Sequence, residues 1–284
     1  MIESGSEQVH ERCVDLHAHS TASDGAVSPV ELVEAAARAG LLAIAITDHD
    51  TIAGNDAAAA AGARACIRVV SGCELSAYDG DLEIHLLTLH IQDPGAMRPR
   101  LEGFQRERIN RGHAIVERLT AIGVPVDMSD VLAEAAGGAL GRPHIARALV
   151  RAGHVADHRD AFDKYLGAGR PAYVPKPRLE IADAIALAHA AGALAVWAHP
   201  GRDGTRERLV RLKTHGLDGT EVRHPGHTPI DTQRLLRLAA ELDLVPSGGS
   251  DWHGATEGYR VIGNMHVPLA WLELQDARLA TRVS

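Results

Sequence analysis

The sequence predicts an α/β fold in which about seven strand–helix units close into a barrel. Short apolar segments of β character alternate with helical segments over the first ninety residues and again beyond residue 179. These strands are apolar along their whole length, which is typical of parallel strands covered by helices. An open, doubly wound sheet is the alternative arrangement of such units.

Helix boundaries separate the strands of the first part of the chain. Ser28, Pro29 and Glu31 form a helix start, in which serine caps, proline takes the first turn and glutamate reaches back. Gly40 ends that helix, and an alanine-rich segment at 52–66 is the next one. The strands predicted around them are 13–17, 41–47, 67–72 and 81–90.

From Pro99 onwards the pattern changes to helices alone, predicted over 101–123, 127–137, 142–153 and 158–167. We expect residues 99–171 to form a helical insert that covers the active site and interrupts a barrel domain built from 12–98 and 172–284. The alternation then resumes, with helices at 179–192, 204–215 and 229–242 and strands at 193–199, 217–223 and 244–253.

The composition restricts the class of protein. The 284 residues are 45% hydrophobic and 23% charged, as in a folded globular chain. A net charge of −8 argues against the broad basic surface that grips long duplex DNA. No apolar stretch approaches the roughly 20 residues of a membrane span, and the N-terminus lacks a secretory signal, so we expect a cytoplasmic protein without a membrane partner. Cys13, Cys66 and Cys73 are too few for a disulfide framework or a cysteine zinc site.

The unusual feature is an excess of histidine, with 17 residues beside only two Phe, four Tyr and three Trp. His17 and His19 lie two apart at the end of the first predicted strand, so both side chains leave the same face. Histidines and carboxylates also follow or interrupt later strands, at the edge where barrel active sites are built. The full set is His17, His19, Asp24, His49, Glu74, His85, His199, Asp251 and His253.

Imidazole and carboxylate groups are the ligands of catalytic Zn, Mn, Fe or Co sites. Nine of them exceed the three or four that one catalytic metal takes, so two or three metals are expected, with at least one carboxylate shared. Such a cluster lowers the pKa of a bridging water and binds phosphoryl oxygens, which predicts phosphate-ester hydrolysis. Taken alone, His85 could equally be a hydrogen-bonded core residue, and His90 is expected to be structural.

Six motifs in order, DLHAHSTASDG, TDHD, GCELS, HLL, AHPGR and SDWH, resemble those of the PHP (polymerase and histidinol phosphatase) superfamily of metal-dependent phosphoesterases. The most similar branch acts on nucleoside 3′,5′-bisphosphates and short 5′-phosphorylated RNA. The resemblance extends from Asp15 to His253 and includes the insert segments RPHIARALV and YLGAGRPAYVP. It implies a distorted (β/α)7 barrel, a trinuclear metal centre and an insert over the barrel mouth.

The resemblance also implies the distribution of the ligands. One metal would be held by His17, His19, Glu74 and Asp251, a second by Glu74, His85 and His199, and a third by Asp24, His49 and His253. Three divalent cations per chain are therefore expected, Mn²⁺ first, with Fe²⁺ or Zn²⁺ as alternatives that suit the same ligands. Asp15 and Asp48, beside ligand histidines, either orient the imidazoles or cap the following turns.

Substrate contacts are predicted around the same opening. Arg142 and His144 lie in the insert, Arg202 follows His199, and His224 ends a strand, so that each could meet a phosphate. His224 or a water is also the expected general acid, because a histidine bound to metal cannot give up a proton there. Lys164 and Tyr165 either reach the nucleoside or belong to a solvated helix face. Glu74, Asp251 and His224 are thus the expected catalytic residues.

The function predicted is hydrolysis of a phosphate monoester of a nucleotide, first of all a nucleoside 3′,5′-bisphosphate such as pAp, by a hydroxide that bridges the metals. The alternative is a 5′–3′ exonuclease that acts on short 5′-phosphorylated oligonucleotides. Histidinol-phosphate hydrolysis ranks below both, as does a metal- or nucleotide-binding module without turnover. The partner expected is a small phosphorylated nucleotide or short oligonucleotide.

Overall fold

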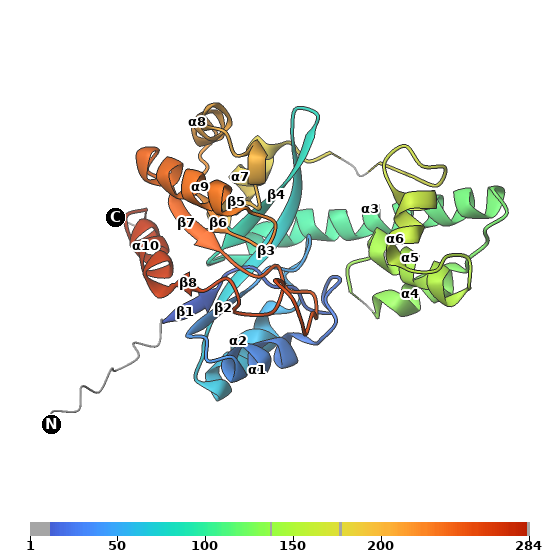
Figure 1. Cartoon of the computed structure of the whole chain (residues 1–284), viewed down its shortest axis with the longest axis horizontal. Coiled ribbons are helices and arrows are strands. Elements are labelled where there is room, and N and C mark those ends of the chain that lie inside the picture. The colour runs from blue at the N-terminus through green and yellow to red at the C-terminus, as the bar shows by residue number, and fades with distance from the viewer. Residues whose placement is uncertain (1–11, 137, 176–177, 283–284) are drawn as a thin grey trace, which may run out of the picture.

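The computed structural model describes residues 12–136, 138–175 and 178–282. Its strands form a single eight-stranded sheet that curves into a nearly closed barrel (Figure 1). The order across the sheet is β7-β6-β5-β4-β3-β2-β1-β8. The strands are β1 Cys13–Asp15, β2 Ala43–Ile46, β3 Arg68–Asp79, β4 Leu82–Leu89, β5 Leu194–Ala198, β6 Gly219–Arg223, β7 Val245–Gly248 and β8 Val267–Pro268.

The barrel closes where the end of β7 meets the end of β1. The Leu16 N–H donates to the Gly248 carbonyl at 3.0 Å, and the Asp251 N–H donates to the His17 carbonyl at 2.9 Å. Gly249 permits this approach, since a Cβ there would lie 2.4 Å from the backbone nitrogen of His17. At the other end of β1, the antiparallel strand β8 pairs with Cys13 and Val14 instead. The circle is therefore distorted, and the predicted barrel, rather than the open sheet, is confirmed.

One part of the prediction was wrong, because the strands are not all parallel. β4 runs antiparallel to both of its neighbours, β3 and β5. Only Gly80 and Asp81 separate β3 from β4, and so short a connection can make a hairpin but not a parallel crossover. β3 is also twice as long as predicted and continues to Asp79.

Helices follow most strands and cover the barrel from outside. Those predicted in the barrel part are present, as α1 Pro29–Arg38, α2 Asn55–Ala65, α7 Ile181–Ala190, α8 Arg206–Thr214 and α9 Pro229–Glu241, with a short 3₁₀ turn η2 at Gly201–Asp203. Ser28 caps α1 in a complete capping box with Glu31, as expected. A further helix, α10 at Leu269–Ala280, was not predicted; it lies against β7.

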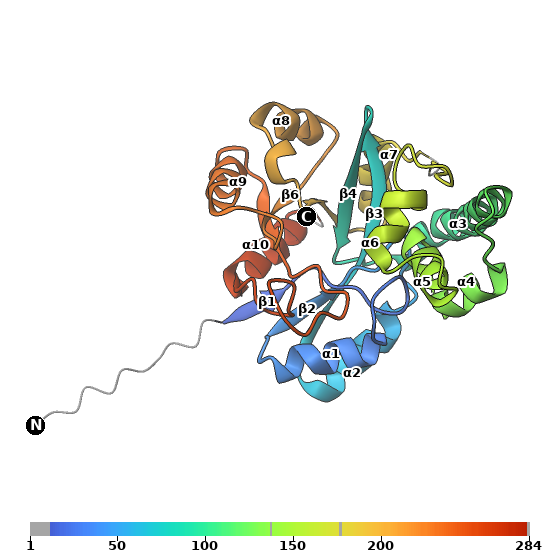
Figure 2. The ribbon, with the colours of Figure 1, turned by 45° about the vertical axis from the view of Figure 1, so that its right-hand side comes forward.

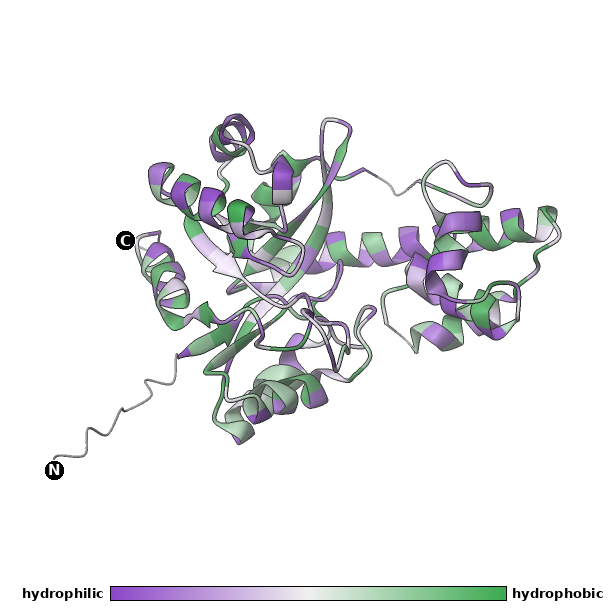
Figure 3. Cartoon of the chain, in the orientation of Figure 1, coloured by the Kyte–Doolittle hydropathy of each residue, from purple (hydrophilic) through white to green (hydrophobic). Residues whose placement is uncertain are grey.

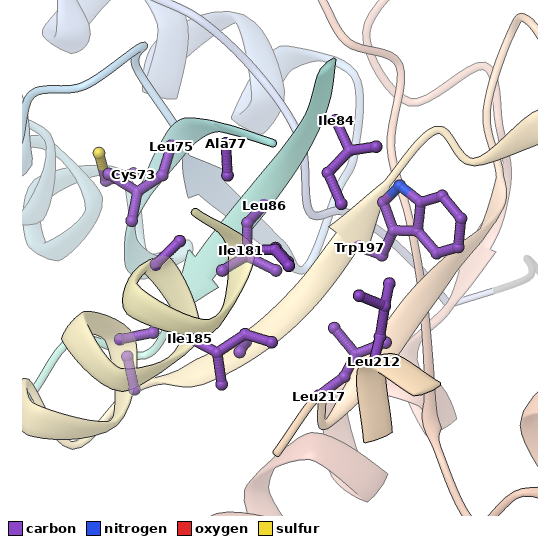
Figure 4. Packing of buried hydrophobic residues seen from close by; sticks show 14 of the residues in the cluster. Cys73, Leu75, Ala77, Ile84, Leu86, Ile181, Ile185, Trp197, Leu212 and Leu217 are labelled. Atoms are coloured by element: carbon purple, nitrogen blue, oxygen red, sulfur yellow. The ribbon is translucent and has the colours of Figure 1, made fainter. Parts of the chain in front are cut away.

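Alternation along the strands separates the two faces of the sheet. On β3 and β4, Cys73, Leu75 and Leu86 point outward and pack against α7, as does Trp197 of β5 (Figure 4). The intervening residues point into the barrel. Glu74 and His85 therefore lie on the interior face although both belong to strands of largely apolar sequence.

The helical extension, residues 94–166, projects to one side of the barrel (Figures 1 and 2). It comprises α3 Pro94–Ala121, α4 Met128–Ala135, α5 Arg142–Arg151, α6 His158–Ala161 and the π-helical turn η1 Phe162–Leu166. The first part of α3, through Phe104, packs in the core beside α7. From Ile115 onwards it belongs to a separate apolar cluster with α4 and α5. One continuous helix thus joins both regions, and the division into domains at residue 99 stays a prediction.

Polar and apolar residues follow this division of surfaces. The strands at the centre carry mostly hydrophobic residues, whereas the helices of the extension alternate between the two kinds (Figure 3). α3 is the longest helix of the described chain, and its mixed surface fits a helix that is half in contact with solvent. Among the described residues, no helix combines the length and the apolar character needed to cross a bilayer.

Candidate metal centre

The nine predicted metal ligands come together at the end of the barrel where the parallel strands finish. His17 and His19 follow β1, His49 follows β2, His199 follows β5, and Asp251 and His253 follow β7. Glu74 and His85 differ from the expectation, because they lie within β3 and β4 rather than after a strand. The bridge between His49 and Glu74 shows that the interior of β3 faces the end of β2 at this level.

Potential ligand atoms gather in three overlapping groups, in each of which they lie within 4.8 Å of one another. The groups are His17, His19, Glu74 and Asp251; His19, Asp24, His49 and His253; and His49, Glu74 and His85. The first is the set that the family resemblance implies for one metal, and the second adds His19 to another implied set. The third contains His49 where the resemblance places His199. The assignment of individual residues to individual metals stays a prediction.

Glu74 occupies the centre of the cluster and divides it. Its Oε1 lies 2.8 Å from His85 Nδ1 and 3.1 Å from His199 Nε2. Its Oε2 lies 3.2–3.3 Å from nitrogens of His17, His19 and His49. Each carboxylate oxygen thus faces a different set of imidazoles, which is the arrangement required of a carboxylate shared by two cations.

The hydrogen bonding of the cluster is incomplete in a way that fits metal ions. His19 Nδ1, His49 Nδ1 and Glu74 Oε2 are buried and lack hydrogen-bond partners among the described residues. His17 Nε2 and His19 Nε2 face each other at 3.1 Å, and both lie within 3.4 Å of Asp251 Oδ1. Buried polar atoms without partners cost free energy, and a cation would satisfy nitrogen and oxygen lone pairs together. The donor set therefore fits divalent cations.

Electrostatics keep the carboxylates ionised. Burial would raise the pKa of Glu74, but His49, His85 and His17 hold it well below its usual range. Burial likewise opposes ionisation of Asp251, whose pKa His17 and His19 hold well below the ordinary value. Burial lowers the pKa of His49 to about 3, so this ring stays neutral at physiological pH. Ionised carboxylates and a neutral imidazole are the forms that bind metals.

Two of the candidate ligands have a backbone conformation that most residues avoid. His199 has a φ of 34° and Asp251 a φ of 49°, in the left-handed region. Both residues come immediately after the end of a strand or its loop, where the chain turns and the side chain is aimed across the barrel mouth. Such strain is retained when the surrounding structure requires it, and it is concentrated at functional sites.

Asp15 and Asp48 cap turns, which settles the alternatives left open above. Asp15 accepts hydrogen bonds from the backbone N–H groups of Ser250 at 3.0 Å and Gly263 at 2.9 Å. Asp48 accepts from the Ser20 N–H at 2.8 Å and from the Ser23 hydroxyl at 2.6 Å. They hold the loops that carry the ligands in place without contacting an imidazole among the described residues.

Glu221, on β6, takes the orienting role instead, and the sequence analysis missed it. It is fully buried, and its Oε1 lies 3.1 Å from His17 Nδ1. Its other oxygen, Oε2, accepts the backbone N–H of His199 at 2.6 Å. The ring of His17 is thereby fixed so that Nε2 points at Glu74 and Asp251. The only local signal was a carboxylate inside the buried strand segment GTEVR.

Replacing Glu221 by Gln should weaken metal binding about 10- to 100-fold, as is usual when a partner that orients a metal-binding histidine is removed. The amide keeps the volume and one hydrogen bond but loses the charge that fixes the ring. Titration of the metal-free variant with Mn²⁺, compared with the wild type, measures the change. An unaltered affinity would show that Glu221 has only a structural role.

His224 lies beside the cluster and has its two ring nitrogens in different environments. Nδ1 accepts the Gly226 N–H at 3.0 Å, so the neutral ring carries its proton on Nε2, 3.3 Å from Asp251 Oδ2. Burial lowers the pKa of His224. Arg260, which was not predicted, also forms an ion pair with Asp251 Oδ2. Both residues line a cavity of about 310 Å³ that borders the cluster.

A larger cavity, of about 480 Å³, opens from the cluster toward the helical extension. Arg142 lines it, as predicted for a substrate contact. His144 is only 1% exposed and its Nδ1 accepts the Gly141 N–H, so that it serves the start of α5. Arg202 lines a separate hollow beside α8 and α9, and Lys164 pairs with Asp160 on the surface. The substrate roles of these residues stay predictions.

Comparison with known proteins agrees with this geometry. The family model of the PHP domain matches residues 15–171. The chain is 37% identical over 266 residues to a 5′-3′ exoribonuclease of Haemophilus influenzae, covering 92% of each chain. It is 36% identical over 259 residues to a 3′,5′-nucleoside bisphosphate phosphatase of Chromobacterium violaceum, covering 88% of this chain and 90% of the relative.

A solved structure from Bifidobacterium adolescentis, assigned as a metal-dependent phosphoesterase, superposes with a TM-score of 0.86 at 35% identity. The match covers 94% of this chain and 96% of that one. Both the helical extension and the cluster of histidines and carboxylates fall within the aligned length of the sequence relatives. The chain belongs to the PHP domain family and is a metal-dependent phosphoric ester hydrolase.

Proposed function

We propose that the protein hydrolyses a phosphate monoester of a nucleoside 3′,5′-bisphosphate. The observation that carries the proposal is the position of the cluster at the border of a cavity of about 480 Å³, a size typical of small-molecule sites. The bisphosphate phosphatase among its relatives supports the same substrate class. Three cations per chain, Mn²⁺ first, remain the number and identity that we propose for the centre.

The nine clustered side chains would hold the cations, and Glu74 would be shared between two of them. Divalent cations bound there supply Lewis acidity toward phosphoryl oxygens and make water nucleophilic at neutral pH. Glu221 orients His17, and the capping residues Asp15 and Asp48 keep the ligand loops rigid. His224 places its Nε2–H beside Asp251, where it can donate a hydrogen bond to the departing ester oxygen.

The test is phosphate release from adenosine 3′,5′-bisphosphate by protein loaded with Mn²⁺, with the chelator-treated protein as control. We expect one equivalent of phosphate and adenosine 5′-monophosphate or its 3′ isomer, with no release after chelation. Tight binding of the nucleotide at full metal occupancy without any phosphate release would favour a binding module over an enzyme.

A second candidate is 5′–3′ exonuclease action on short 5′-phosphorylated oligonucleotides. It is favoured by the two cavities that share His49, His85 and His199 and so border the cluster from two directions. A scissile phosphodiester has chain on both sides, and two cavities could receive both. The exoribonuclease relative supports this candidate. Stepwise release of mononucleotides from a 5′-phosphorylated hexamer, at a rate exceeding that of bisphosphate hydrolysis, would make it the principal activity.

A further inference from the structure

The larger cavity has a wall of arginines contributed by the helical extension. Arg108 and Arg111 lie three residues apart on α3 and therefore share a face. Arg142, at the start of α5, lines the same cavity. From the barrel, the cavity is lined by Asp24, His49, His85 and His199 of the candidate metal centre. One hollow thus joins the metal-binding groups to three guanidinium groups.

The charges of these arginines are compensated unequally. Arg108 is neutralised by an ion pair with Asp50 and also donates to the Leu140 carbonyl at 3.1 Å. Arg142 donates to the Leu166 carbonyl at 3.1 Å, and its guanidinium lies 5.4 Å from the ring of Phe162. Arg111 donates through Nε to the Val174 carbonyl at 2.8 Å. Within the described residues, neither Arg111 nor Arg142 forms an ion pair with a carboxylate.

Arg111 is the group whose surroundings ask most clearly for an anion. Its side chain is largely buried, 8% exposed, and Nη2 has no hydrogen-bond partner among the described residues. Burial and the nearby charges of Arg142 and Arg108 lower the pKa of Arg111 to about 10, while Glu83 on β4 opposes this only in part. The residue therefore stays charged at neutral pH while its charge is poorly solvated and crowded by like charges.

We propose that Arg111 and Arg142 bind the second phosphate of a bisphosphorylated nucleotide while the first lies at the metal centre. This inference rests on the proposed function and assigns a specificity-determining site to it. Guanidinium groups donate paired hydrogen bonds to phosphate oxygens, and a dianion would compensate the charge crowded on this wall. Arg108, held by Asp50, forms the supporting part of the wall.

The experiment compares kcat/KM for adenosine 3′,5′-bisphosphate with that for adenosine 3′-monophosphate. Both substrates carry the same 3′-phosphate, so general damage to the centre cancels in the ratio. The wild type should prefer the bisphosphate at least about tenfold, since charge-assisted hydrogen bonds are among the strong ones. In Arg111→Met and in Arg142→Met the ratio should fall to about twofold or less, chiefly through KM. Arg106→Met, which removes an exposed arginine from the same helix, should keep the wild-type ratio.

The outcomes separate the two levels of the account. Equal efficiency on both substrates in the wild type, or an unchanged ratio in both arginine variants, would overturn the second-phosphate site while leaving the phosphatase in place. No hydrolysis of either substrate would instead contradict the proposed function. Should Arg111→Met fail to fold, the ratio for Arg142→Met and for Arg111→Lys, which keeps the charge but loses the paired donors, still decides the matter.

Discussion

Glu74→Gln should lose bound metal and phosphatase activity together, with kcat reduced about 1000-fold or more. Both oxygens of Glu74 face imidazoles, on two sides of the cluster, and an amide can offer only one oxygen and no charge. Removal of a charge from the centre of a metal cluster eliminates the Lewis acidity on which the reaction depends. Metal content by elemental analysis and phosphate release are measured on the same preparation.

Asp218→Asn is the matched control for this substitution. Asp218 is also a buried carboxylate, but it lies at the start of β6 and accepts the Ala195 N–H at 2.8 Å. Its substitution should lower the free energy of unfolding and leave the metal content unchanged. A Glu74→Gln protein that retains both its metal and its activity would contradict the shared role of this carboxylate.

His224→Asn should reduce kcat on a nucleotide about 100-fold, while hydrolysis of p-nitrophenyl phosphate should fall only a few-fold. The reason is that a poor alkoxide leaving group needs a proton or a hydrogen bond as the ester bond breaks, whereas nitrophenolate does not. The Nε2–H of His224 lies next to Asp251 at the border of the cluster and can supply it. Steady-state kinetics on the two substrates give the comparison.

His227→Asn provides the control, since this histidine lies close by but both of its ring nitrogens are engaged by the backbone. Nδ1 lies 3.0 Å from the Val222 carbonyl, and Nε2 accepts the Gly201 N–H at 3.0 Å. Its loss should affect both substrates alike. If His224→Asn also reduced both substrates equally, His224 would be a residue that positions Asp251, and the proton would come from water.

The candidate ligands could be predicted from the sequence because each has a local signal. A histidine or carboxylate placed after an apolar strand is costly unless it has a function, and strand ends of a barrel share one edge. His85 shows the same logic inside a strand, where its alternation with Leu86 fixes which face it occupies. The barrel itself followed from the strand–helix alternation, and His90 is indeed structural, with its Nε2 3.1 Å from Gln275 Oε1.

What could not be predicted depends on contacts between distant segments. Glu221 and His17 are 204 residues apart in the chain, and no spacing links them. The pairing of Arg108 with Asp50, and the opening that Arg111 shares with the metal centre, depend on how the helical extension sits against the barrel. The antiparallel course of β4 was decided by a short turn, which the prediction treated as another link between parallel strands.

The most direct test is crystallography of the Mn²⁺-loaded protein with anomalous scattering recorded at the manganese edge. We expect at least two peaks, and three for full occupancy, within bonding distance of the nine clustered side chains and with Glu74 between two of them. A single peak remote from Glu74, or none at saturating Mn²⁺, would contradict the multinuclear centre on which the proposed chemistry depends.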